Sequence, residues 1–311
     1  MKTLGRHLKD YLTLRRQLGF KFYVEGSYLR GFVGFAREQG ARFISTKLAL
    51  QWATLPANIT QKQRAQRLCV VRGFAEYLRA LEPRTEVLSP KLIPARAFRP
   101  EPHLYTETQV VRLIRAARQI DPGHEVRGLT LSTLLGLLAV TGMRVGEALA
   151  LDRADVDLAE ALVTLRRSKG NKSRLVPLHS STTQALEHYA RRRDKFYPHP
   201  VSQSFFVWEG GVRLSYQVAW EWFREAACQA GLRPLGGGRG GPRIHGLRHC
   251  FAVHTLLNWY RRDVDVDVHL PELATFLGHA HVTDTYWYIS AVPELLALAT
   301  RRWERAEKGQ K

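Results

Sequence analysis

Four prolines within thirteen residues, 90–102, divide this sequence into two parts. Proline has no backbone N–H and clashes with the preceding helical turn, so neither helices nor central strands pass easily through such a segment. Three cations, Lys91, Arg96 and Arg99, accompany the prolines, a composition typical of an extended linker. The segment predicts two separately folded parts, and 311 residues are enough for two domains.

The part before the linker, residues 1–89, shows helical periodicity throughout. Apolar side chains recur at spacings of three and four residues, in segments beginning near Leu4, Tyr28, Ser45 and Thr60. The first half of the longest segment is crowded with basic residues: Lys62, Arg64, Arg67 and Arg72. We expect a small helical bundle whose basic face contacts DNA. A solvated basic face without a partner is the alternative.

The part after the linker mixes helical and strand patterns. Thr106 and Gln109 match a capping box at a helix start. A turn at residues 168–172 predicts a hairpin, because it separates two short β-prone runs. Buried helices are expected at 129–140 and 145–151, a helix at 215–230, a strand pair at 205–212 and further helices over most of 245–311.

These patterns predict a mainly α fold with a small antiparallel β-sheet, that is, an α+β chain. We expect a helical DNA-binding domain at 1–89, a linker at 90–104, a second domain at 105–291 and a C-terminal helix or tail at 292–311. Pro293 can occupy the first position of that helix. An apolar stripe through Leu295, Leu296 and Trp303 would then pack either on its own domain or on a neighbouring copy.

The net charge of the chain indicates which class of molecule it binds. The chain carries a net charge of +19, and its first 100 residues hold 19 basic against 6 acidic side chains. Such a field attracts polyanions, which favours nucleic acid over a ribosomal or membrane-surface role. The three cysteines are widely spaced and form no CxxC pair, which excludes the usual zinc-ribbon, iron–sulfur and thioredoxin-like sites. With no signal-peptide or membrane-span pattern, we expect a cytoplasmic, nucleoid-associated protein.

Four short motifs point to a chemistry. They are TGMRVGEAL at 141–149, KGNKSRLVPL at 169–178, HGLRH at 245–249, and LGH at 277–279, which Tyr288 follows nine residues later. In this order and spacing they resemble the tyrosine recombinases, the family of phage integrases and chromosome-dimer resolvases. The resemblance spans residues 106 to about 296, and the helical part before it matches the family's core-binding domain in position and character.

The resemblance implies a metal-free phosphodiester chemistry. Two arginine forks would hold the phosphate, and a tyrosine would attack it to form a 3′-phosphotyrosyl bond and free a 5′-hydroxyl. That bond conserves the energy of the phosphodiester, so no ATP or other cofactor is required. The implied catalytic residues are Arg144, Lys169, His245, Arg248, His279 and Tyr288.

Some assignments have rivals. The spacing from His279 selects Tyr288 over Tyr286 as the nucleophile. Lys169 matches the family's general acid, while its neighbours Lys172 and Arg174 are rivals for that role and candidate DNA contacts. Glu147 matches an acidic family position and is expected to hold Arg144 in place. For Arg144 and Arg248 the alternative is a structural salt bridge, to Glu147 or Asp284.

The function that follows is a site-specific DNA recombinase. Its partners would be double-stranded DNA at specific sites, further copies in a synaptic tetramer and, in some systems, other recombinases. Trp287 and the run 290–296 resemble transposon-carried members, which suggests integration or excision of a mobile element. The alternatives are a catalytically silent DNA-binding accessory protein and a type IB topoisomerase-like enzyme without site preference.

One departure from the simplest family members is the length of the segment between Arg248 and His279. The extra residues, about 258–270, are expected to form a surface extension. Asp263, Asp265 and Asp267 alternate there with valines, but the glycine and closing glutamate of a calcium-binding loop are missing, so no metal site is expected.

Overall fold

The computed structural model describes residues 3–94, 103–121, 123–166, 173–233 and 241–309. The chain divides into two compact units, Met1–Pro100 and Glu101–Lys311. Each unit has its own hydrophobic core, so the two are described separately.

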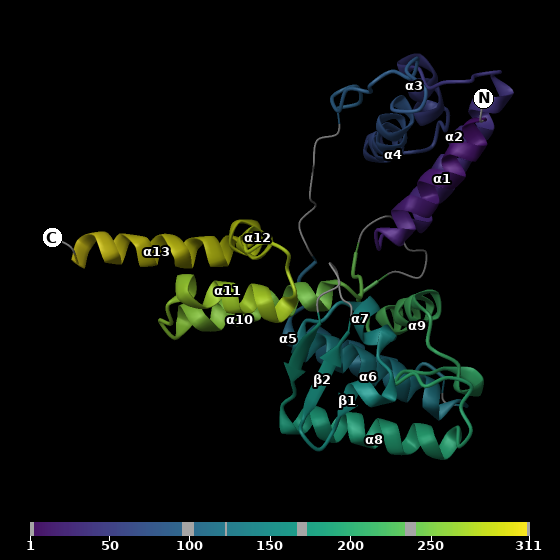
Figure 1. Cartoon of the computed structure of the whole chain (residues 1–311). Helices are drawn as coiled ribbons and strands as arrows, with labels where there is room; N and C mark the ends of the chain where they lie inside the picture. Colours follow the sequence, from purple (N-terminus) through teal and green to yellow (C-terminus); the bar gives the residue numbers. More distant parts are fainter. Residues whose placement is uncertain (1–2, 95–102, 122, 167–172, 234–240, 310–311) are drawn as a thin grey trace. The chain divides into compact units, whose positions relative to one another are not determined.

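The described residues of the N-terminal unit form a bundle of four helices (Figure 1): α1 (Leu4–Gln17), α2 (Tyr23–Glu38), α3 (Thr46–Thr54) and α4 (Gln61–Arg79). Capping explains where two of them begin. The Ser45 hydroxyl accepts a hydrogen bond from the Leu48 amide at the start of α3, and Thr60 and Gln63 form a capping box at the start of α4. Leu29, Phe32 and Phe74 are fully buried between the helices, so tertiary packing holds the bundle together.

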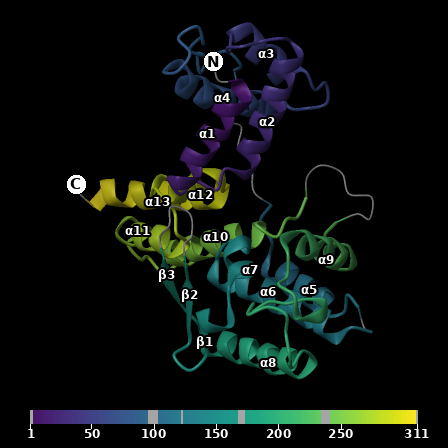
Figure 2. The ribbon, with the colours of Figure 1, turned by 45° about the vertical axis from the view of Figure 1, so that its right-hand side comes forward.

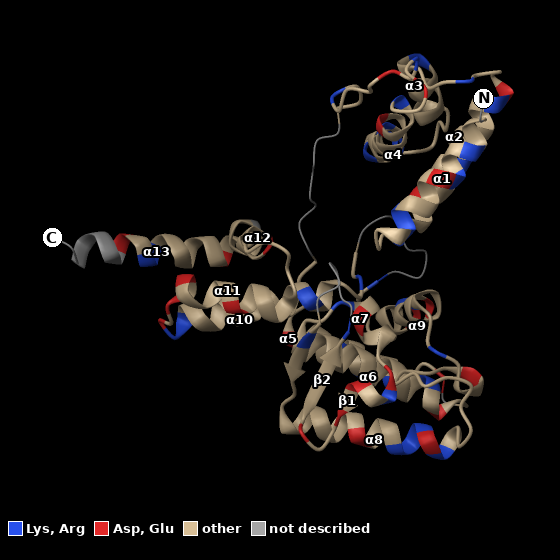
Figure 3. Ribbon diagram, viewed as in Figure 1, with Lys and Arg blue, Asp and Glu red and all other residues tan. Residues whose placement is uncertain are grey.

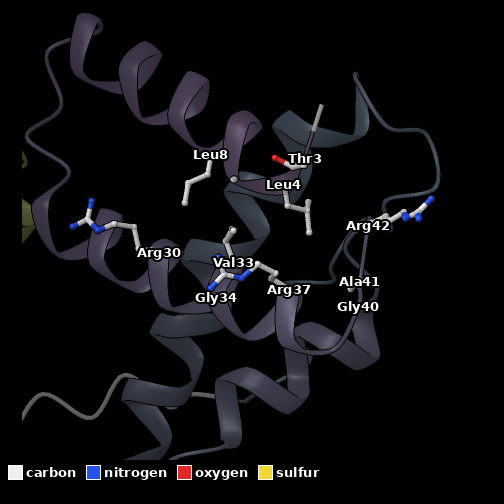
Figure 4. A pocket seen from close by; sticks show the side chains of 11 residues that line it. Thr3, Leu4, Leu8, Arg30, Val33, Gly34, Arg37, Gly40, Ala41 and Arg42 are labelled. Carbon is white, nitrogen blue, oxygen red and sulfur yellow. The ribbon is translucent and has the colours of Figure 1, made fainter. Parts of the chain in front are cut away.

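A hollow of about 860 Å³ lies between the beginning of α1 and α2 (Figure 4). Leu4, Leu8 and Val33 supply apolar side chains to its lining. Arg30, Arg37 and Arg42 lie around it, so part of this unit's positive charge surrounds an apolar surface. The helical periodicity of the sequence gave no indication of this hollow.

The C-terminal unit contains nine described α-helices and a three-stranded antiparallel sheet, ordered β1-β2-β3 (Figure 2). The helices are α5 (Glu107–Arg118), α6 (Glu125–Thr141), α7 (Val145–Ala150), α8 (Ser180–Phe196), α9 (Tyr216–Gln229), α10 (Gly246–Arg261), α11 (Val266–Leu277), α12 (Thr283–Ala291) and α13 (Pro293–Gly309). The strands are β1 (Val156–Asp157), β2 (Leu162–Leu165) and β3 (Arg174–Pro177), and two short 3-10 helices are η1 (Arg153–Asp155) and η2 (Glu209–Gly211).

Two clusters of buried side chains organise this unit. The larger one surrounds α6, which is apolar on every side and packs against α5, α8 and α10. The second joins α10 to α13 through residues such as Leu256, Leu270 and Leu295. Helix α10 contributes to both clusters, so its first turn has a fixed position between them.

The predicted fold class is confirmed: the chain is mainly helical with one small antiparallel sheet. The predicted strand pair at 205–212 is wrong. In place of two strands, the described residues form one isolated β-bridge here, between Val207 and Arg213. Gly210 and Gly211 adopt positive φ within η2, which turns the chain before strands can extend. The run is apolar because Phe206 and Val207 are buried in the core.

The predicted surface extension at 258–270 is also wrong in part. Helix α10 continues to Arg261, and Val266 and Leu270 of α11 are buried in the second cluster. The three aspartates of the segment, Asp263, Asp265 and Asp267, are exposed, and so is Val268. Among the described residues, no helix has both the length and the apolarity to cross a membrane.

Candidate active site

Arg144 is positioned by the turn between α6 and α7. Gly142 ends α6 in the left-handed conformation, at φ +59°, and the chain then re-enters a helix with Arg144 as the N-cap of α7. Two fixed acceptors hold the guanidinium: Nη1 donates to Oε1 of Glu147 at 2.7 Å, and Nη2 donates to the carbonyl of Gly278 at 2.7 Å. The charge of Arg144 is therefore held in one place before any ligand arrives.

Glu147 lies between two arginines. Its carboxylate accepts hydrogen bonds from Arg144 and, at 2.7 and 3.1 Å, from the guanidinium of Arg174. Burial alone would raise the pKa of Glu147, but the hydrogen bonds and charges of Arg174 and Arg144 outweigh it and lower that pKa. Glu147 thus stays ionised and links α7 to strand β3.

Gly278, which ends α11, has a conformation and surroundings that only glycine fits. Its φ is +69°, and a Cβ there would lie 2.6 Å from Nη1 of Arg174 and 3.4 Å from Nη1 of Arg144. The absent side chain lets both guanidinium groups approach the backbone. Arg174 also donates from Nε to the carbonyl of Phe276 at 2.9 Å.

Arg248 lies in the first turn of α10 and is 3% exposed. Its Nη1 donates to the carbonyl of Gly142 at 2.8 Å, whereas its Nη2 is buried without a hydrogen-bond partner among the described residues. Burial and the neighbouring positive charge of Arg144 lower the pKa of Arg248 to about 10. A buried donor without an acceptor costs folding free energy, so this position favours a ligand that supplies an acceptor. The positive charge around it favours an acceptor that is an anion. Within the described part of the chain, Asp284, which we expected as an alternative partner, forms no salt bridge with Arg144 or Arg248.

Tyr288 lies on α12, is 2% exposed, and is close enough to Arg248 to raise the pKa of that guanidinium, against the larger lowering by burial. Its hydroxyl is 3.1 Å from Nδ1 of His249, the residue that follows Arg248. The Tyr288 ring also packs against Trp287 and stacks with His279 at 6.3 Å between ring centres. Tyr286 is 45% exposed instead.

The two other histidines predicted for the site flank this group. His245 precedes α10 as its N-cap, is exposed, and its ring centre is 4.8 Å from that of His249. His279 is half-buried, and its Nδ1 is 2.7 Å from the hydroxyl of Thr285. His279 is therefore tied to the start of α12, three residues before Tyr288.

The two strands of the predicted hairpin are present as β2 and β3, paired in the register Val163 with Val176, while the predicted turn at 168–172 lies outside the described residues. Lys169 and Lys172 lie outside the described residues. Arg174, which we expected among the DNA contacts, is engaged inside the protein by Glu147 and by the Phe276 carbonyl.

The predicted basic face of α4 is present but heterogeneous. Figure 3 shows basic residues along α1 and α4. Lys62 is exposed, and Arg64 is half-buried. Arg67 donates to the carbonyl of Trp52 at 2.8 Å and lies 3.7 Å from its ring centre, and Arg72 pairs with Glu76 on the same helix. Arg67 and Arg72 thus already have protein partners.

Sequence reasoning missed the contact of His249. That histidine belongs to the HGLRH motif, but its spacing gave no reason to connect it to Tyr288, 39 residues away. Thr285, fully buried and bonded to His279, was missed as well. No group of three or more potential metal-ligating side chains is found within the described part of the chain.

Comparisons with known proteins identify the family of this chain. The model of the phage integrase family matches residues 104–294. The chain is 40% identical over 309 residues to a Sinorhizobium fredii protein named as an integrase/recombinase, y4rB, covering 98% of each. It is 34% identical over 240 residues to the tyrosine recombinase XerD of Mycobacterium tuberculosis, covering 75% of this chain and 70% of that one.

The fold is shared with a solved structure as well. The crystal structure of XerH site-specific recombinase, bound to palindromic difH substrate in a post-cleavage complex, aligns with a TM-score of 0.67. The alignment covers 97% of this chain and 85% of that one, at 21% identity, so the likeness concerns the fold.

Proposed function

Because this chain belongs to the phage integrase family of tyrosine recombinases, we propose that it cuts and rejoins DNA at specific sites through a 3′-phosphotyrosyl intermediate. Tyr288 is the nucleophile, and Arg144 and Arg248 bind the scissile phosphate. His245 and His279 complete the set of groups at that phosphate, and Lys169 is the acid that protonates the departing 5′-oxygen.

One observation carries the proposal. Among the described residues, the buried Nη2 donor of Arg248 has no hydrogen-bond partner, and the Arg248 guanidinium lies close enough to Arg144 and Tyr288 for both to shift its pKa. A phosphate oxygen is the acceptor that would satisfy this donor and balance the charge of both arginines. A catalytically silent DNA-binding protein would have no need to bury an arginine next to a tyrosine and leave its Nη2 donor unsatisfied.

In the proposed step the Tyr288 oxygen attacks phosphorus while the bond from phosphorus to the 5′-oxygen breaks. The two arginines stabilise the charge that builds up on the non-bridging oxygens. Rejoining is the reverse reaction with another 5′-hydroxyl, and the phosphotyrosyl bond supplies its energy. The reaction therefore uses neither a metal ion nor ATP.

The test is a covalent-trapping experiment. Full-length protein is incubated with nicked duplexes tiled across the DNA that flanks its gene, and a denaturing gel detects covalently linked protein. We expect linkage on a few tiles and none elsewhere. No linkage on any tile contradicts the proposal, and relaxation of supercoiled plasmid without site preference favours the topoisomerase alternative.

The biological role that we propose is integration or excision of a mobile element, performed in the cytoplasm at the nucleoid. Support comes from Trp287 and the run 290–296, which resemble transposon-carried recombinases. Inverted repeats or an element boundary next to the gene would agree with this role. Tiles that react within a chromosomal resolution site would instead point to a resolvase.

We also propose that four copies assemble on two sites through α13. One side of this helix packs on its own unit, with Leu295 fully buried. Leu296 and Trp303 remain 51% and 62% exposed. Two exposed apolar side chains on one helix favour a protein contact, and docking in trans would couple assembly to the neighbouring α12, which carries Tyr288.

The double variant Leu296→Glu with Trp303→Glu tests this assembly while leaving the buried Leu295 in place. We expect single-site binding to persist and cooperative binding to paired sites to be lost, as measured by gel shift and light scattering. Ala297→Glu, at an exposed position of the same helix, is the control. Unchanged cooperativity in the double variant would eliminate docking through this surface.

A further inference from the structure

The hydrogen bond between His249 and Tyr288 carries an inference that rests on the proposed function. We propose that His249 accepts the phenolic proton of Tyr288 as that residue attacks the phosphate. His249 is thus an additional catalytic residue, beyond the six that the sequence motifs imply.

The contact is direct. Nδ1 of His249 lies 3.1 Å from the Tyr288 hydroxyl, within the range that proton transfer requires. A neutral imidazole that carries its proton on Nε2 leaves Nδ1 able to accept from a phenol. The His249 ring is packed by His245, Trp287 and Tyr288, with ring centres between 4.8 and 5.7 Å away, so it has little freedom to turn.

The position of His249 on α10 places the proposed base next to Arg248, the residue proposed to bind the phosphate. Arg248 and His249 are consecutive residues in the first turn of α10, which is fixed between the two clusters of the unit. Arg248 would hold the phosphate while His249 holds the attacking oxygen. One rigid turn would thereby set the distance between nucleophile and phosphorus, a distance on which the rate depends steeply.

The proton and electron balance of the step is complete. The Tyr288 oxygen forms a bond to phosphorus, and its proton moves to Nδ1 of His249. The electron pair of the broken bond leaves with the 5′-oxygen, which takes a proton from the acid, Lys169 in the proposed mechanism. During rejoining His249 returns its proton to the phenolic oxygen, so the enzyme ends in its original protonation state.

The alternative is that His249 only holds the buried Tyr288 in place. Two substitutions separate these roles. In His249→Asn the amide can still hydrogen-bond the phenol but cannot take its proton, whereas His249→Ala removes both functions. His188→Asn, on the exposed side of α8, is the matched control.

The experiment measures single-turnover cleavage of a nicked substrate that full-length wild-type protein is known to cleave. If the wild type cleaves nothing, the proposed function itself fails. We expect His249→Asn and His249→Ala each to cleave about 100-fold more slowly than wild type, with unchanged DNA affinity. His188→Asn should match the wild type. A holding role predicts instead that His249→Asn keeps the wild-type rate, and that result would overturn the proposal.

Two further readouts exclude a merely structural effect. A 5′-bridging phosphorothiolate substrate removes the need for an acid at the leaving group, so it should rescue Lys169→Met but not His249→Asn. The rate of His249→Asn should also rise with pH between about 7 and 9, as the phenol loses its proton to solvent base. The other titratable groups facing this pair, His245, His279 and Arg248, are unchanged in the variant. Rescue by the phosphorothiolate, or a wild-type pH profile, would overturn the proposal.

Discussion

Positive charge is held by different means in the active site and on α4 of the N-terminal unit. Arg144 and Arg174 share the buried Glu147 and reach backbone carbonyls, and Arg248 is buried beside them. On α4, Lys62 is exposed to solvent, and Arg72 contacts only side chains of its own helix in the described structure, the exposed Glu76 and the sulfur of Cys69. Fixed charges can stabilise a transition state, because they need no reorganisation during the reaction. Solvated charges can only add to the attraction for DNA.

The largest expected effect falls on the proposed nucleophile, Tyr288. Tyr288→Phe removes one oxygen from a buried ring, so we expect DNA binding to persist and the covalent complex to disappear. A denaturing gel with a nicked substrate measures this loss. Tyr286→Phe, on the exposed side of α12, should still form the complex, and the opposite pattern would show that the nucleophile is misassigned.

The next effect would come from removing the charges of the N-terminal unit. A fragment of residues 104–311 keeps the buried arginines of the active site but loses the basic helices. We expect about 1,000-fold weaker binding and a shallower dependence of affinity on salt, since several phosphate contacts vanish. Binding titrations at several salt concentrations measure both. If the fragment and the full chain had equal affinities and equal salt slopes, the charges that bind DNA would lie in the C-terminal unit.

A smaller effect is expected for the carboxylate that fixes the arginines. Glu147→Gln removes the charge between Arg144 and Arg174, and we expect cleavage to slow by about 100-fold, because small displacements of reacting groups cost that much. Removing one partner of a buried ion pair also costs about 3 kcal/mol of unfolding free energy. Glu187→Gln, in an exposed pair on α8, should change neither quantity.

This stability difference depends on pH in a defined direction. The pKa of Glu147 is lowered in the folded chain, so its carboxylate stabilises the fold above the ordinary glutamate pKa. That contribution is lost as the pH falls through the lowered value. Denaturant titrations should therefore show wild type and Glu147→Gln converging in stability at acidic pH. A constant difference from neutral to strongly acidic pH would contradict the role of this carboxylate.

The smallest effects distinguish the basic residues of α4 from one another. Lys62→Gln should weaken DNA binding only a few-fold and reduce the salt slope by about one unit, without changing thermal stability. Arg67→Gln should instead lower stability by about 1 kcal/mol, because it loses its bond to Trp52 and the ring contact. If Lys62→Gln destabilises the fold, the division between solvated and structural charge is wrong for this helix.

Much of the fold could be predicted from the sequence, since local periodicity and capping determine where helices begin and end. The segments beginning near Leu4 and Thr60 became α1 and α4 within a few residues. The strand pair at 205–212 failed because an apolar run looks the same in a buried loop as in a strand. Burial of Val266 and Leu270 was missed because the alternating aspartates suggested a solvated segment.

The site was predictable as a set of residue types and less so as a geometry. Motif spacing selected Arg144, Arg248 and Tyr288, and the structure places Arg144 and Tyr288 near enough to Arg248 to shift its pKa. Motif spacing could not show that Arg174 hydrogen-bonds to Glu147 inside the protein or that Nδ1 of His249 contacts the Tyr288 hydroxyl. Those contacts depend on how α10, α11 and α12 pack, which is a tertiary property that no local pattern records.

Gly142 and Gly278 have a consequence for how the protein can diverge. Each ends a helix in the left-handed conformation and offers its carbonyl to one arginine of the site. Every amino acid has a carbonyl, so substitutions of the surrounding side chains do not remove these two acceptors. The backbone anchors of Arg144 and Arg248 are therefore independent of side-chain identity around them. Exposed surfaces of the chain could be redesigned toward new DNA targets while two glycine backbones still hold both arginines.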